Sequence, residues 1–143
     1  MCPSFYDLTG DAESIDRRLA TARESLTRVE PQDLTEWQDD VAFVIDIRPE
    51  ASRRANGHIP GAVVIDRSVL EWRLDPTSGY SMSDGPTKDD VVVVVCNEGY
   101  SSSLAASDLK RLGFRWAADL VGGFRGYVEA GLPIDEEPTR VVE

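Results

Sequence analysis

The chain has 143 residues, the size of one ordinary domain, with 41% hydrophobic and 29% charged residues. That balance is too apolar for a disordered chain and too often interrupted by charge for a membrane protein. The formal net charge of −11 repels phosphate backbones and anionic lipid surfaces, so nucleic acid and membrane are excluded as expected partners. Because the N-terminus carries no basic region followed by an apolar one, we expect a cytoplasmic location.

The first predicted element is an amphipathic helix over residues 11–29. Its apolar residues recur every three or four positions and share one helical face: Ile15, Leu19, Ala22, Leu26 and Val29. Asp11 is the expected N-cap. Pro31 then suits the first turn of a second short helix, which carries Leu34 and Trp37.

Four later segments are rich in valine, isoleucine and alanine and have the length of buried strands: residues 41–47, 62–65, 91–95 and 117–121. The third has no polar alternation, so both of its faces should be covered. This pattern indicates a central strand of a parallel sheet. Between the last two strands, Ala105, Leu109 and Leu112 share a helical face and predict a helix over residues 100–112.

Strands that alternate with helices predict an α/β fold, with a mostly parallel central sheet flanked by helices. Residues 75–90 are rich in proline, glycine, serine and aspartate and should form an exposed loop. From residue 135 onward the chain is acidic and has no periodicity, so we expect a tail. We divide the chain into an N-terminal helical extension (1–30), a core domain (31–134) and an acidic tail (135–143).

Cys96 directly follows the predicted central strand and precedes a helix. This is the edge at which open α/β sheets place their ligand crevice. Backbone N–H groups of the next six residues could turn toward the sulfur and stabilise an anion there: Asn97, Glu98, Gly99, Tyr100, Ser101 and Ser102. The thiolate is the nucleophilic form of cysteine. The alternative is that Cys96 only packs, as buried free cysteines often do.

Four motifs resemble those of the rhodanese family and occur in its order. Residues 46–50 (Asp-Ile-Arg-Pro-Glu) are similar to its first-strand signature, and residues 57–62 (Gly-His-Ile-Pro-Gly-Ala) to the segment before its second strand. Residues 96–99 (Cys-Asn-Glu-Gly) resemble its active-site loop. Residues 122–127 resemble its closing segment, although a tryptophan is more usual where Tyr127 stands. The resemblance covers about residues 31–133 and implies a rhodanese-like three-layer fold.

The resemblance also implies a single-domain sulfurtransferase. Cys96 would take sulfur from a donor such as thiosulfate or a persulfide and carry it as a persulfide to a thiol or cyanide. A sulfur-accepting protein is a further candidate partner, and no metal or organic cofactor is needed. In the family an arginine commonly stands where this chain has Ser101, so we expect Arg67, Arg73 or Arg125 to compensate. The alternative is a preference for persulfide or protein-bound donors.

The same fold also serves other functions. A non-catalytic rhodanese-like module for protein contact or redox sensing would share the fold, and oxidation could pair Cys2 with Cys96. Phosphatases of this fold carry an arginine six positions after the cysteine, where this chain has Ser102. A phosphoryl transition state would lack its charge partner, so the phosphatase interpretation is disfavoured.

Three further residues are predicted to support the site structurally. Asp46 and Arg48 lie two positions apart at the end of a strand, so they share a face and should form an ion pair. His58 is the only histidine. We expect it to hydrogen-bond structurally, with Asp46 as a candidate partner, rather than to act as general base for Cys96.

Overall fold

A computed structural model describes residues 12–40 and 43–143. Its centre is a six-stranded sheet of order β1-β5-β4-β2-β3-β6, in which every neighbouring pair of strands is parallel. The strands are β1 (Thr27–Val29), β2 (Phe43–Asp46), β3 (Val63–Ile65), β4 (Val91–Val95), β5 (Trp116–Leu120) and β6 (Arg140–Val142). The predicted parallel sheet with 91–95 as an inner strand is confirmed.

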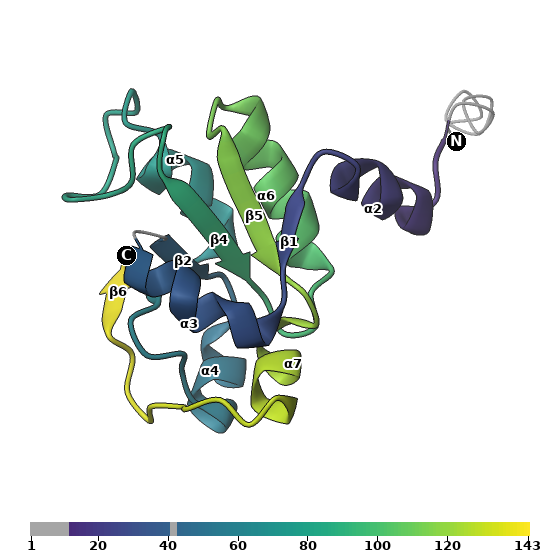
Figure 1. Cartoon of the computed structure of the whole chain (residues 1–143). Helices are drawn as coiled ribbons and strands as arrows, with labels where there is room; N and C mark the ends of the chain where they lie inside the picture. Colours follow the sequence, from purple (N-terminus) through teal and green to yellow (C-terminus); the bar gives the residue numbers. More distant parts are fainter. Residues whose placement is uncertain (1–11, 41–42) are drawn as a thin grey trace, which may run out of the picture.

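Helices cover both faces of this sheet. They are α2 (Ile15–Arg23), α3 (Pro31–Asp40), α4 (Glu50–Asn56), α5 (Leu70–Leu74), α6 (Ser101–Arg111) and α7 (Gly123–Glu129), with a 3-10 turn η2 (Arg67–Val69) before α5. Figure 1 shows α3 in front of the sheet, α5 and α6 behind it, and α4 and α7 together beyond the end of β4. This arrangement is the predicted α/β fold, with helices on both sides of the sheet.

Strand β4 contributes to two hydrophobic cores because its successive side chains point to opposite faces. Val92 and Val94 pack with the core formed by α5 and α6, whereas Val93 and Val95 pack on the side of α3 and α7. All four valines are fully buried, which stabilises the fold by about 1.5–3 kcal/mol each. Burial on both faces of β4 explains why residues 91–95 are all apolar.

The predicted helix over residues 11–29 is wrong in its second half. Helix α2 ends at Arg23, and Thr27–Val29 form strand β1, which pairs with β5. Two β-branched residues and the hydrogen bonds offered by β5 favour the strand over a helical continuation. The expected cap Asp11 lies outside the described residues, and the side chain of Ser14 accepts the N–H of Arg17 at 3.1 Å instead.

The predicted tail over residues 135–143 is also corrected. Arg140–Val142 form strand β6 and pair with β3, and the backbones of His58 and Asp135 form an antiparallel bridge. Only two of its three residues are apolar, and this run is too short to be recognised as a strand from sequence. Because β6 covers the outer edge of β3, the segment belongs to the sheet.

The remaining elements agree with the sequence within a few residues. The second helix, the strands and the helix after Cys96 are all present, and residues 75–90 contain no helix or strand. Helices α4, α5 and α7 were not predicted, and each is seven residues or shorter. Within the described part of the chain, no helix is long and apolar enough to cross a bilayer.

Candidate active site

Cys96 lies directly after β4, with 7% of its surface exposed. Two backbone N–H groups of the following loop donate hydrogen bonds to its sulfur, from Gly99 at 3.1 Å and from Ser102 at 3.3 Å. Donors in this position stabilise negative charge on the sulfur. The expectation that the loop turns N–H groups toward Sγ therefore holds for these two residues.

The sulfur faces an open recess of about 460 Å³. Of the six loop residues in the predicted site, four line this recess: Asn97, Glu98, Tyr100 and Ser101. The rest of the wall comes from the segment after β2 and from η2: Ile47, Arg48, Pro49 and Arg67. Gly99 and Ser102 are not part of the recess lining, and they contact the sulfur through their N–H groups.

The first turn of α7 holds the beginning of the Cys96 loop through hydrogen bonds. The N–H of Phe124 donates to the carbonyl of Cys96 at 2.8 Å, and the N–H of Arg125 donates to the carbonyl of Asn97 at 3.0 Å. Gly123, with φ of +62°, approaches so closely that a Cβ there would lie 2.5 Å from the Cys96 carbonyl oxygen. Only glycine permits this contact.

A buried polar network holds the back of the loop. The carboxylate of Asp119 in β5 is fully buried and accepts the hydroxyls of Ser102 at 2.8 Å and Ser103 at 2.7 Å. Arg28 of β1 donates to both oxygens of this carboxylate, at 3.0 and 3.3 Å. A buried carboxylate requires such partners, because an unpaired charge there would cost several kcal/mol.

The predicted ion pair between Asp46 and Arg48 is present. The shortest of its hydrogen bonds is 2.7 Å, and both side chains are almost fully buried. Arg48 also donates to the Gly57 carbonyl at 2.7 Å and lies over the ring of Phe124, 3.7 Å from its centroid. The pair thus joins the segment after β2 to α7 beside the recess.

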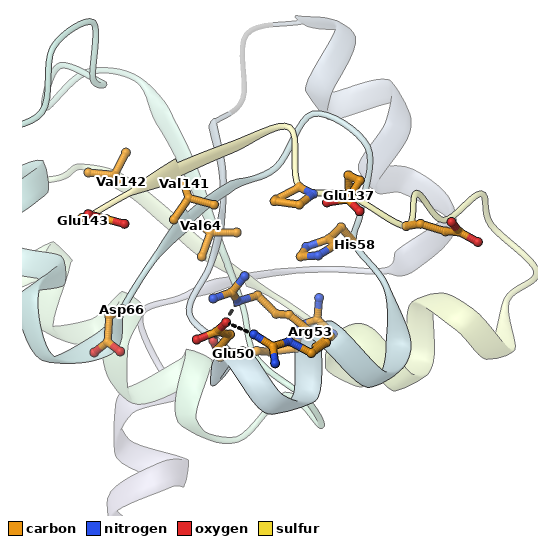
Figure 2. A pocket seen from close by; sticks show the side chains of 13 residues that line it. Glu50, Arg53, His58, Val64, Asp66, Glu137, Val141, Val142 and Glu143 are labelled. Atoms are coloured by element: carbon orange, nitrogen blue, oxygen red, sulfur yellow. Dashed lines mark hydrogen bonds and ion pairs between the residues drawn. The ribbon is translucent and has the colours of Figure 1, made fainter.

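His58 lies outside the Cys96 recess. It lines a separate cavity of about 630 Å³, in which Figure 2 shows its ring beside Glu137. Its Nδ1 has no hydrogen-bond partner among the described residues, and the suggested bond to Asp46 is absent. Burial lowers the pKa of His58 below its ordinary value, and the guanidinium groups of Arg48 and Arg53 lower it further.

The three arginines proposed to compensate for Ser101 occupy different places. Arg67 lines the recess, where it pairs with Glu71 at 2.7 Å and Asp108 at 2.9 Å. Arg125 pairs with Glu98 at 3.2 Å and lines a neighbouring pocket. Arg73 donates to the Tyr80 carbonyl in the loop before β4 and lies outside the recess. Arg67 is therefore the candidate that shares a wall with Cys96.

Sequence reasoning missed the network behind the loop. One signal was available, because Asp119 is the only charged residue of the predicted strand 117–121. A carboxylate in a buried strand requires a partner. The partner Arg28 could not be inferred, because it lies in the segment that was predicted to be helical.

Among the described residues, no group of three or more histidine, cysteine or acidic side chains is arranged to hold a metal ion. Cys2 lies outside the described residues, so its pairing with Cys96 stays untested. The cysteine, its N–H donors and the open recess suit a nucleophilic reaction at sulfur.

Comparisons with known proteins point in the same direction. Residues 30–130 match a family model described as a rhodanese-like domain. The thiosulfate sulfurtransferase GlpE of Haemophilus influenzae is 30% identical over 78% of this chain and 96% of its own length. A Synechococcus elongatus protein provisionally named thiosulfate sulfurtransferase is 29% identical over 68% of this chain, and the chain spans only 34% of that relative.

Solved structures include a similar fold from Rhodopseudomonas palustris. That protein, of unknown function and described as a possible tyrosine phosphatase, is 29% identical with a TM-score of 0.79. The match covers 87% of this chain and 96% of that one. It therefore extends beyond the segment matched by the family model.

Proposed function

Because the chain belongs to the rhodanese-like domain family, we propose that it is a sulfurtransferase with Cys96 as its nucleophile. The observation that carries the proposal is the pair of N–H donors, from Gly99 and Ser102, on a cysteine at the end of an inner strand. These donors stabilise the thiolate before the reaction. They also stabilise the anionic sulfur that forms during it.

The proposed reaction has two displacements. The Cys96 thiolate attacks the outer sulfur of thiosulfate, the donor's S–S bond breaks, and sulfite leaves with the bonding electron pair. Cys96 then carries a persulfide. A thiol or cyanide attacks the outer sulfur of this persulfide, the S–S bond to Sγ breaks, and the thiolate is restored. Atoms and electrons balance without a further reactant.

Intact-mass measurement tests the proposal directly. We expect a Cys2→Ser protein to gain the mass of one sulfur atom with thiosulfate or a persulfide donor, and to lose it to cyanide as thiocyanate. The Cys2→Ser, Cys96→Ser protein is the control and should gain nothing. If neither donor leaves sulfur on Cys96, the transferase proposal fails. The chain would then act as a non-catalytic interaction or redox-sensing module.

Arg67 is proposed as the residue that binds the anionic end of thiosulfate. Its guanidinium lines the recess beside Cys96, although Glu71 and Asp108 already share its charge. We expect Arg67→Ala to raise the KM for thiosulfate by about tenfold, the value of one weakened charge-assisted hydrogen bond.

Arg73→Ala is the matched control for this substitution. Arg73 lies on α5, close to Arg67 in sequence, but its side chain contacts Tyr80 rather than the recess. Steady-state kinetics of both variants decide the matter. Equal KM values for the two variants would mean that thiosulfate gains nothing from Arg67.

Phosphatase activity is the second candidate, and it follows from the description of the Rhodopseudomonas palustris structure. The loop itself argues against it. Ser101 and Ser102 stand where an arginine is needed, and the hydroxyl of Ser102 is already bound to Asp119. A trigonal phosphoryl group would therefore lack a guanidinium partner in the loop. Hydrolysis of a phosphotyrosine peptide that disappears in Cys96→Ser would favour the phosphatase.

A further inference from the structure

Two arginines that precede the family-matched segment reach the loop of Cys96. Arg23 is the last residue of α2, and Arg28 lies in β1, whereas the family model begins at residue 30. Arg23 donates through Nη2 to the Gly99 carbonyl at 2.7 Å, and Arg28 donates through Nη2 to the same oxygen at 3.1 Å. The carbonyl is thus held from two elements at once.

The same arginines also fix the other end of the loop. Arg23 donates through Nε to the Ser103 hydroxyl at 3.0 Å, and Arg28 is paired with Asp119. Asp119 in turn accepts the hydroxyls of Ser102 and Ser103. Residues 99–103 are therefore restrained at both ends. This segment includes both N–H donors to the sulfur of Cys96.

Arg23 differs in its partners from the other charged side chains around the loop. The other charged side chains near the sulfur form ion pairs: Arg48 with Asp46, Arg67 with Glu71 and Asp108, Glu98 with Arg125, and Asp119 with Arg28. Within residues 12–40 and 43–143, Arg23 has no carboxylate within ion-pair distance. Its positive charge therefore remains available to stabilise an anion on the other side of the loop.

We propose that Arg23 and Arg28 are positioning residues for Cys96. They orient the segment that carries the Gly99 and Ser102 N–H groups, and Arg23 supplies positive charge that the loop lacks at Ser101 and Ser102. The planar guanidinium of Arg23 binds a carbonyl and a hydroxyl together, which a lysine ammonium cannot do in the same geometry. The inference deepens the proposed function and rests on it for the sulfur-transfer measurement.

The test compares Arg23→Met and Arg23→Lys with Arg18→Met, all in a Cys2→Ser background. Arg18 is an exposed arginine of the same helix whose guanidinium pairs with Glu13, so it is the matched control. The first readout is the rate of Cys96 alkylation by iodoacetamide, which requires no sulfur donor. The second is sulfur transfer from thiosulfate to cyanide.

We expect Arg23→Met to slow alkylation about tenfold near neutral pH, because a loop that has lost a charge-assisted hydrogen bond stabilises the reactive thiolate less. In strong base the difference should vanish, because hydroxide removes the proton without help from the loop. Arg23→Lys should recover part of the alkylation rate, since it keeps the positive charge but loses the planar guanidinium that makes both hydrogen bonds. Arg18→Met should match the parent protein, and sulfur transfer should follow the same order.

Equal alkylation rates of Arg23→Met and Arg18→Met near neutral pH would overturn the proposal. A fall that persists unchanged in strong base would also overturn it, because reduced access to the sulfur slows the reaction at every pH. Sulfur uptake and the alkylation rates distinguish the positioning proposal from the sulfurtransferase proposal. If the parent protein takes up no sulfur while the alkylation rates differ as expected, the sulfurtransferase proposal fails and the positioning role stands.

Discussion

His58 is a buried histidine whose chemistry is set by its surroundings. Only 5% of its surface is exposed, and its pKa lies below the ordinary value, first because of burial and then because of Arg48 and Arg53. Asp46 and Glu137 oppose this shift without reversing it. The lowered pKa favours the neutral imidazole in the folded protein.

This lowered pKa predicts that acid destabilises the fold through His58. Below the unfolded value of about 6.5, the unfolded chain binds the proton more readily than the folded one. The free energy of unfolding should therefore decrease as the pH falls from about 6.5 through the lowered pKa. His58→Gln should lose less stability over the same interval.

Urea unfolding of both proteins, in half-unit steps from near-neutral pH to below the lowered pKa, measures the difference. Other groups titrate in this range, so only the change in slope between the two proteins is informative. Parallel curves would show that His58 takes up its proton equally in both states.

At the scale of elements, the contact between α7 and the Cys96 loop depends on Gly123. A Cβ at this position would lie 2.5 Å from the Cys96 carbonyl oxygen and 2.7 Å from the backbone nitrogen of Glu98. These atoms are backbone and cannot turn aside as a flexible side chain would. An added methyl group must therefore push the loop and α7 apart.

Gly123→Ala should reduce the free energy of unfolding by about 2–5 kcal/mol, as the sum of left-handed strain and overpacking. Gly131→Ala is the matched control, since Gly131 has φ of +77° and nothing within 4 Å of its Cβ position. It should cost only about 1–2 kcal/mol. Chemical denaturation checks both values, and equal losses would mean that the close approach contributes nothing.

The elements that could be predicted from sequence are those with a strong local pattern. The run Val91–Val95 and the helix after Cys96 were placed correctly because hydrophobic periodicity is a property of neighbouring residues. Strands β1 and β6 were missed because neither has more than two consecutive apolar residues and each exists through its pairing with β5 or β3. Such pairings depend on residues far away in sequence.

The candidate site shows the same division. The cysteine, its loop and the Asp46–Arg48 pair follow from motifs of adjacent residues. The supporting network of Arg28 and Asp119 does not, because its members come from β1 and β5 and meet only when these strands pair. Local sequence therefore predicts the candidate nucleophile, whereas the residues that hold its loop are seen only in the fold.

On the scale of the whole molecule, the strand order explains why the site lies where it does. Strand β4 is flanked by β5 and β2, so the loops after all three strands meet at one edge of the sheet. Cys96 follows β4, Arg48 follows β2, and α7 begins after β5. Figure 1 shows α4 and α7 beneath this edge. Three segments that are separate in sequence thus meet at the Cys96 loop.

The contacts that hold the Cys96 loop join residues far apart in the chain. Arg28 and Asp119 are separated by 91 positions, and Arg23 and Gly99 by 76. Contacts of such range form late in folding, because a long stretch of chain must first be closed. During synthesis, Cys96 leaves the ribosome before β5 does. A newborn chain therefore passes through a stage in which Cys96 has been made but its loop still lacks the contacts with Asp119 of β5.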